Sequence, residues 1–169
     1  RSNAMICMCM DRAWICIAIS GIYPVYFRYL PSFQVASMSE LIAVIGGTGL
    51  YSMMEGFEMT RQEIVSTPYG EASSPLVFGT LQGREVVFIA RHGFTHRLPP
   101  HQVNYRANIW MLKKAQVSKI LSVNAVGAIN PQCPPESLAI PDQIIDYSYG
   151  REHTFYAEDL ERVVHIDFT

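Results

Sequence analysis

Residues 41–47 read LIAVIGG. A run of five apolar residues that stops at a pair of glycines is typical of a strand buried on both faces, as in parallel or mixed sheets. In such sheets, helices cover both faces of the strands. This stretch therefore predicts an α/β protein whose sheet contains residues 41–45.

A hairpin is predicted downstream of this strand. The β-rich runs 76–81 and 85–90 are separated by residues 82–84, which read QGR. A glycine in so short a connection suits the tight turn of an antiparallel hairpin. Both runs are rich in apolar residues, so we expect them in the same sheet as residues 41–45.

One helix and two more strands complete the pattern. Over residues 104–116, apolar residues recur at i, i+4, i+7 and i+10, which is the spacing of one helical face. Lys113 and Lys114 lie near its end, where the helix dipole favours cations. Residues 119–123 and 143–147 are interpreted as two further buried strands. The alternation of strands and helix makes α/β the expected class.

The composition excludes some classes of function. The chain has 169 residues, with 13 Lys and Arg against 15 Asp and Glu, and a formal net charge of −2. Binding to many phosphates needs clustered basic residues, so no nucleic-acid partner is expected. The mean hydropathy of +0.11 is high for a soluble chain with 17% charged residues. The apolar excess lies in residues 1–37.

Residues 1–37 are interpreted as a tag scar followed by an atypical apolar extension. Residues 2–4, before Met5, look like the remnant of a cleaved expression tag. The apolar stretch 13–27 is too short and too interrupted for a membrane-spanning helix, and the basic start and cleavage site of a secretory signal are missing. Two interpretations stay open: an upstream extension before a natural start at Met38, or an arm that packs against a neighbouring subunit.

The four cysteines suggest neither a metal centre nor a disulfide framework. Cys7 and Cys9 have the wrong spacing for a zinc knuckle, and no nearby histidine or second pair completes a tetrahedral set. Cys133 lies far from the other three. We therefore expect no metal, no membrane association and a reduced, cytoplasmic chain.

The sequence GGTG at residues 46–49 follows the first buried strand. Its glycines let the backbone approach a ligand closely and turn several N–H groups towards an anion, with the hydroxyl of Thr48 as a further donor. It matches neither the dinucleotide-binding motif nor the P-loop. A phosphate cradle and a purely structural turn are both open at this point.

Two more predicted strands end in polar residues. Arg91 and His92 follow the second strand of the hairpin, and Asn124 follows the run 119–123. An arginine fork beside a histidine suits a phosphate or carboxylate. Alternatively, Arg91 pairs with an acidic residue and His92 caps its loop. Because α/β proteins bind ligands at the carboxyl ends of strands, we expect these three residues and Thr48 around one pocket.

In order along the chain, these motifs resemble those of the purine nucleoside phosphorylase superfamily, in particular its 5′-methylthioadenosine and S-methyl-5′-thioinosine phosphorylases. Several motifs at matching separations are more specific than any one of them. The matching stretches are IGGTGLY (45–51), TPYG (67–70), ARHG (90–93), HQVNYRANIW (101–110), VNAVGAI (123–129) and IDYSYGREHTFY (145–156).

The resemblance implies a three-layer fold with a central mixed β-sheet flanked by helices. It assigns residues 38–169 to the N-terminal portion of a nucleoside phosphorylase domain. Family members continue well beyond residue 169, so we expect the fold to be incomplete at its C-terminus. A homotrimer is also implied.

The implied activity is phosphorolysis by a pentosyltransferase. Inorganic phosphate attacks C1′ of a purine nucleoside, S-methyl-5′-thioinosine or 5′-methylthioadenosine, and releases the free base and methylthioribose 1-phosphate. Phosphate is a co-substrate, and no cofactor is expected. Two alternatives stay open: a nucleoside hydrolase of the same fold, and a non-catalytic remnant that binds phosphate or nucleoside.

Site residues follow from the resemblance, position by position. The residue that protonates the purine is expected beyond residue 169, so no catalytic residue is assigned. The matching residues are Thr48, Arg91 and His92 for phosphate, Asn124 and Ala125 for the nucleoside, and His165 for a contact that a neighbouring subunit makes near the 5′ substituent.

Overall fold

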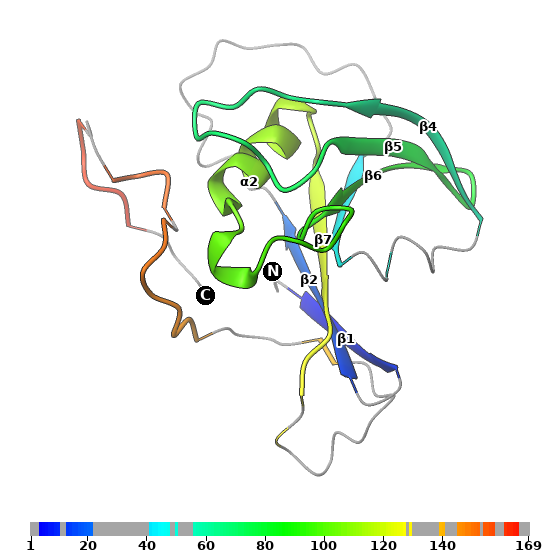
Figure 1. Cartoon of the computed structure of the whole chain (residues 1–169), viewed down its shortest axis with the longest axis horizontal. Coiled ribbons are helices and arrows are strands. Elements are labelled where there is room, and N and C mark those ends of the chain that lie inside the picture. The colour runs from blue at the N-terminus through cyan, green and yellow to red at the C-terminus, as the bar shows by residue number, and fades with distance from the viewer. Residues whose placement is uncertain are drawn as a thin grey trace.

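The computed structural model of the chain contains a mixed β-sheet with helix α2 packed against it (Figure 1). The strands lie in the order β1-β2-β7-β3-β6-β5-β4. Their bounds are Ala4–Met10 (β1), Ala13–Gly21 (β2), Ile42–Gly46 (β3), Phe57–Glu63 (β4), Leu76–Leu81 (β5), Arg84–Ala90 (β6) and Lys119–Asn124 (β7). The structure describes residues 4–10, 13–21, 41–47, 50, 56–127, 129, 139–140, 145–152, 154–157 and 161–165.

Three parallel strands form the centre of the sheet. β3 pairs with β6 on one side and with β7 on the other, and both pairs are parallel. The register places Gly46 beside Ala90, and Ile45 beside Ser122. The three strands therefore end at one edge of the sheet, as the sequence predicts. The predicted α/β class with a mixed sheet is confirmed.

The predicted hairpin is also confirmed. β5 and β6 are antiparallel, and the turn between them has Gln82 and Gly83 with φ angles of 50° and 77°. Positive φ at both central residues is typical of a type I′ turn, in which glycine is favoured. β4, which apolar periodicity does not predict, pairs antiparallel with β5 and has a register shift between Met59 and Arg61. Most of its residues are exposed and polar, so its sequence lacks the apolar signal.

Helix α2 spans Tyr105–Lys114 and confirms the predicted helix. A short 3₁₀-helix, η2, precedes it at Pro100–Gln102. Asn104 caps α2: its Oδ1 accepts a hydrogen bond from the N–H of Ala107 at 3.1 Å, and its Nδ2 donates to the carbonyl of Tyr69 at 2.6 Å. The cap therefore satisfies a free N–H of the helix and also ties the helix start to the loop before β5.

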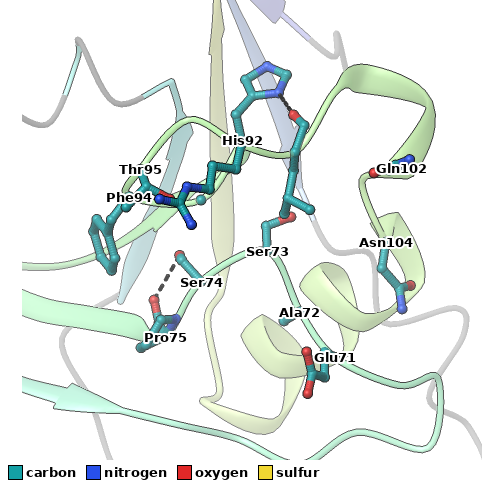
Figure 2. A pocket seen from close by; sticks show the side chains of 13 residues that line it. Glu71, Ala72, Ser73, Ser74, Pro75, His92, Phe94, Thr95, Gln102 and Asn104 are labelled. Carbon is teal, nitrogen blue, oxygen red and sulfur yellow. Dashed lines mark hydrogen bonds between the residues drawn. The ribbon is translucent and has the colours of Figure 1, made fainter.

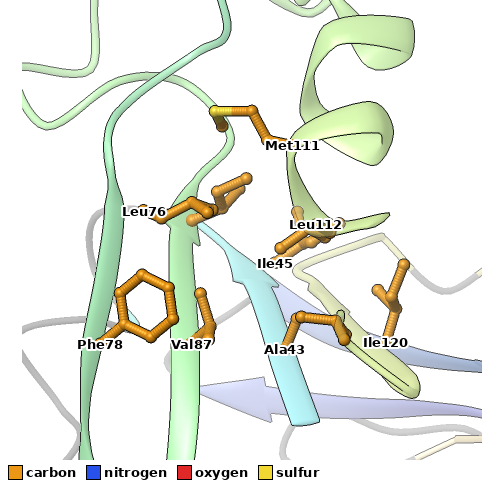
Figure 3. Packing of buried hydrophobic residues seen from close by; sticks show 10 residues of the cluster. Ala43, Ile45, Leu76, Phe78, Val87, Met111, Leu112 and Ile120 are labelled. Atoms are coloured by element: carbon orange, nitrogen blue, oxygen red, sulfur yellow. The ribbon is translucent and has the colours of Figure 1, made fainter. Parts of the chain in front are cut away.

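The sheet carries an apolar cluster on each face. Side chains alternate between the faces along a strand, which explains why the central strands read as continuous apolar runs. In the cluster between the sheet and α2, Met111 and Leu112 of the helix lie against strand residues (Figure 3). That cluster comprises Ala43, Ile45, Leu76, Phe78, Val87, Ile89, Met111, Leu112, Val117 and Ile120, and the cluster on the other face comprises Val44, Val77, Phe88, Ala90 and Val123.

One predicted strand is wrong in the part that the structure describes. Residues 145–147 have no regular secondary structure, and Ile145 and Tyr147 are 77% and 86% exposed. Residues 143–144 lie outside the described residues. The backbone groups of a strand need a neighbouring strand, and none of the described strands pairs with residues 145–147. The apolar run alone does not produce a strand here.

The N-terminal extension contributes a hairpin to the sheet. β1 and β2 are antiparallel, and β2 pairs antiparallel with β7, with Ile17 beside Val123 and Gly21 beside Lys119. β7 therefore has a hydrogen-bonded neighbour on both sides. The composition of residues 1–37 does not indicate this pairing, and the division of the chain after residue 37 stays a prediction. Within the described ranges, no helix has the length and apolar character needed to cross a membrane.

Candidate functional site

A cavity of about 300 Å³ lies near the ends of β3, β6 and β7, between the sheet and α2. The carboxyl ends of parallel strands are where α/β proteins bind ligands. Polar side chains reach the cavity from the residue after β6, from β7 and from α2. Its lining residues are Ile45, Arg91, Tyr105, Asn108, Ile109, Ile120, Ser122 and Asn124. We call it the strand-end cavity.

Arg91 brings a positive charge to the strand-end cavity. Its backbone N–H donates to the carbonyl of Gly46 at 2.8 Å, which fixes the residue beside the glycine loop. Burial lowers the pKa of its guanidinium from the usual value, and the nearby Tyr105 acts in the opposite direction. Within the described residues, no carboxylate forms an ion pair with Arg91. A half-buried cation without such a partner is suited to an anionic ligand.

His92 contacts Arg91 but faces a different cavity. The Nε–H of Arg91 donates to Nε2 of His92 at 3.2 Å, and Nδ1 of His92 lies 2.8 Å from the carbonyl oxygen of Leu98. His92 does not line the strand-end cavity. It lines a second pocket of about 610 Å³, the loop pocket, where Figure 2 shows its ring and the hydrogen bond to Leu98. The structure therefore joins the two predicted phosphate ligands by a hydrogen bond but places them in different cavities.

Asn108, Ser73 and Ser74 connect the two cavities. Asn108 is only 2% exposed, and both the oxygen and the nitrogen of its side-chain amide form hydrogen bonds. Its Oδ1 accepts from the N–H of Ser73 at 2.8 Å, and its Nδ2 donates to Oγ of Ser73 at 2.9 Å. Oγ of Ser74 accepts from the N–H of Ala90 at 3.0 Å. The loop before β5 is thereby fixed to α2 and to the last residue of β6, immediately before Arg91.

The predicted nucleoside residues divide between the cavity and the surface. Asn124 is half-buried, lines the strand-end cavity and donates through Nδ2 to Oγ of Ser122 at 3.3 Å. That hydrogen bond orients the amide, and within the described residues no donor is bonded to its Oδ1, which can accept a hydrogen bond. Ala125 is exposed and is not among the residues that line either cavity.

The other two predicted site residues are Thr48 and His165. Thr48 lies outside the described residues. Beside it, the N–H of Leu50 donates to the carbonyl of Gly47 at 3.1 Å. His165 is exposed and lines neither cavity. Its contact with a neighbouring subunit stays a prediction.

Sequence reasoning missed three polar lining residues: Tyr105, Asn108 and Ser122. Tyr105 and Asn108 are three positions apart on α2, and Ser122 is two positions before Asn124 on β7, so each pair shares a face of its element. The alternation along β7 could have identified Ser122 once Asn124 was a candidate. Across the described ranges, no group of three His, Cys, Asp or Glu side chains could hold a metal ion.

Comparisons of sequence identify relatives over most of the chain. Residues 41–169 match the phosphorylase superfamily. The chain is 54% identical over 127 residues to the probable S-methyl-5′-thioinosine phosphorylase of Pseudomonas syringae pv. tomato, a match that covers 75% of this chain and 51% of that protein. It is 46% identical over 125 residues to the S-methyl-5′-thioadenosine phosphorylase of Pyrococcus furiosus, covering 74% of this chain and 47% of that protein. The chain thus spans about half the length of these curated relatives.

A solved structure shares sequence with a smaller part of the chain. The methylthioadenosine phosphorylase from an antarctic soil metagenomic library is 49% identical, with a TM-score of 0.44 and coverage of 48% of this chain and 28% of that one. The superposition covers less than half of this chain, whereas the sequence match to the Pseudomonas syringae protein covers three quarters of it. By the match over residues 41–169, the chain belongs to the phosphorylase superfamily.

Proposed function

We propose that this chain binds inorganic phosphate and a purine nucleoside in the strand-end cavity, for phosphorolysis of the nucleoside. One observation carries the proposal. Arg91 is half-buried at the cavity, and none of the described carboxylates pairs with it. A phosphate would give this partly desolvated cation charge-assisted hydrogen bonds to an anion.

The remaining lining supports a nucleoside beside the phosphate. Asn124 and Ser122 offer hydrogen-bonding groups from β7, and three isoleucines provide apolar surface. A ribose with hydroxyl groups and a base with apolar faces need this mixture of partners. The named relatives support S-methyl-5′-thioinosine or 5′-methylthioadenosine as the nucleoside.

In the proposed reaction, a phosphate oxygen attacks C1′ as the bond from C1′ to the purine nitrogen breaks. The electron pair of that bond leaves with the base, and the products are the free purine and a sugar 1-phosphate. Arg91 would orient the phosphate and hold its negative charge near the developing positive charge at C1′. This activity makes the chain part of a pentosyltransferase.

The leaving purine also needs a proton. The described residues that line the strand-end cavity include no carboxyl or imidazole group that could supply it. General acid catalysis is typically worth about 10² to 10⁴ in rate. We therefore expect a general acid from a residue outside this lining, with Thr48 as a further phosphate ligand. The reaction as proposed uses no cofactor or metal.

Arg91 favours phosphorolysis over hydrolysis, because a water nucleophile does not need a cation to hold it. Product analysis separates these reactions. The purified protein is incubated with S-methyl-5′-thioinosine, with and without phosphate, and the base and sugar products are quantified. We expect base release that requires phosphate and yields sugar 1-phosphate.

Each other result has a defined meaning. Release of free sugar would establish a hydrolase, and phosphate binding without base release would indicate a non-catalytic binding protein. A protein that neither binds phosphate nor releases base would contradict the proposal. The matched control is Arg84→Ala, at an exposed arginine beside the hairpin turn, compared with Arg91→Ala. A homotrimer in the cytoplasm is proposed on the family resemblance alone, and light scattering would measure the oligomeric state.

A further inference from the structure

The hydrogen bonds of His92 determine its protonation pattern. An arginine side chain can only donate, so the contact from Nε of Arg91 at 3.2 Å requires a lone pair on Nε2 of His92. A carbonyl oxygen can only accept, so the contact of 2.8 Å to Leu98 requires a proton on Nδ1. Together they define a neutral imidazole with its proton on Nδ1.

This imidazole has no donor left for an anion. The oxygens of a phosphate accept hydrogen bonds from N–H or O–H groups. The ring N–H of a neutral His92 already donates to the carbonyl of Leu98, and its other ring nitrogen accepts from Arg91. His92 also lines the loop pocket rather than the strand-end cavity. A direct hydrogen bond to phosphate in the strand-end cavity would require the ring to give up its present partners.

The loop after β6 keeps the imidazole in place. The N–H of Leu98 donates to the carbonyl of His92 at 3.1 Å, so the same two residues are joined through both backbone and side chain. Gly93 donates its N–H to the carbonyl of Ala90 at 2.9 Å and has a φ of 73°. A side chain at Gly93 would be strained at this φ, and its Cβ would lie 3.3 Å from the carbonyl oxygen of Ser73.

The hydrogen bond to His92 uses Nε of Arg91 and does not involve the two terminal nitrogens of the guanidinium. Within the described part of the chain, neither terminal nitrogen of Arg91 has a hydrogen bond or ion pair of its own. A guanidinium whose terminal nitrogens are available can bind two phosphate oxygens at once. Fixing Nε in advance lowers the entropic cost of ordering the side chain when the anion binds.

We propose that His92 is a positioning residue that holds the guanidinium of Arg91 for phosphate through Nε2, and that its imidazole ring does not bind phosphate. The proposal rests on the proposed function, because it takes phosphate as the ligand of Arg91. It gives the side chain of His92 a role different from the direct ligand that the family resemblance implies.

A double-mutant cycle distinguishes the two roles. The Kd for inorganic phosphate is measured by calorimetry on the full chain and on Arg91→Ala, His92→Ala and the double variant. We expect His92→Ala to weaken binding about 10-fold when Arg91 is present, the size of one lost hydrogen bond to a charged group, and to have no further effect on Arg91→Ala. An equal loss in both backgrounds would show a direct ligand and overturn the proposal.

Two more variants control for structure. His92→Gln replaces the acceptor nitrogen by an amide oxygen at a similar distance along the side chain, so we expect it to restore part of the affinity. His101→Ala removes an exposed histidine on η2 and is expected to leave the affinity unchanged. If His92→Gln binds phosphate no better than a correctly folded His92→Ala, a hydrogen-bond acceptor for Nε of Arg91 does not contribute to phosphate binding, and the proposal fails.

A spectroscopic measurement on the unmodified protein needs neither a variant nor a ligand. The ¹⁵N chemical shifts of the His92 ring report which nitrogen carries the proton, and we expect protonated Nδ1 and unprotonated Nε2. A proton on Nε2 would overturn the proposal even if phosphate binds. Failure of the unmodified protein to bind phosphate, with the expected ring signals present, would overturn the proposed function while leaving the Arg91–His92 hydrogen bond established.

Discussion

The strand-end cavity and the loop pocket are each lined by an arginine, and the two arginines differ in their exposure to solvent. Arg91 is half-buried, its backbone is bonded to Gly46, and its Nε is bonded to His92. Arg97 is exposed in the larger loop pocket. We therefore expect desolvation and a fixed orientation, and not only a charge in a pocket, to give a guanidinium its affinity for an anion.

Removing each arginine in turn tests this comparison with the largest expected effect. Arg91→Ala should weaken phosphate binding by about 100-fold, because two charge-assisted hydrogen bonds are lost at a partly desolvated site. Arg97→Ala should change it by less than about two-fold, because exposed charges are screened by solvent. Calorimetric titration with phosphate measures both. Similar losses for the two variants would contradict the distinction between the cavities.

The second prediction concerns Asn108, which connects the two cavities. Asn108→Ala removes two hydrogen bonds and leaves the N–H of Ser73 without its partner, so we expect a loss of about 2 to 3 kcal/mol in the free energy of unfolding. Urea denaturation measures this loss. Lys114→Ala, on an exposed position of the same helix, should change stability by less than about 0.5 kcal/mol. Equal effects would show that helix α2 does not depend on this connection.

The third prediction concerns the bond between Ser74 and the end of β6. Ser74→Ala leaves the buried N–H of Ala90 without an acceptor, which should cost about 1 to 2 kcal/mol of stability. Because Ala90 precedes Arg91, phosphate affinity should also fall by a few fold. Thr95→Ala, at an exposed residue of the same loop pocket, should change neither quantity. A Ser74→Ala protein of full stability and affinity would contradict the positioning role of this bond.

Local sequence pattern was sufficient to predict the elements that form the strand-end cavity. A recognisable apolar pattern is present within each of these elements: β3, the β5–β6 hairpin, α2 and β7. The parallel pairing of β3 with β6 and β7 then places Arg91 and Asn124 at one edge of the sheet. The polar strand β4 lacks such a pattern. For residues 145–147, the apolar residues gave a false prediction because no described strand pairs with them.

The connection between the cavities could not be predicted from local pattern. Ser73 and Asn108 are 35 positions apart, and a serine before a strand and an asparagine within a helix carry no signal that they meet. The same holds for His92, whose residue type suited an anion although its ring bonds to Arg91 and Leu98. Residue type and strand end predict where a site lies, while the assignment of roles within it depends on hydrogen bonds between side chains.

The smallest predicted effect separates the two halves of the strand-end cavity. Ser122→Ala removes the acceptor for Nδ2 of Asn124, a hydrogen bond of 3.3 Å that orients the amide. The bond is long and only half-buried, so we expect nucleoside binding to weaken by about three-fold, the low end for one neutral hydrogen bond. Phosphate binding should not change, because Ser122 has no contact with Arg91 among the described hydrogen bonds. Calorimetry with S-methyl-5′-thioinosine and, separately, with phosphate measures the two affinities. A larger loss of affinity for phosphate than for nucleoside would contradict this division. It would mean that residues of β7 bind the phosphate together with Arg91.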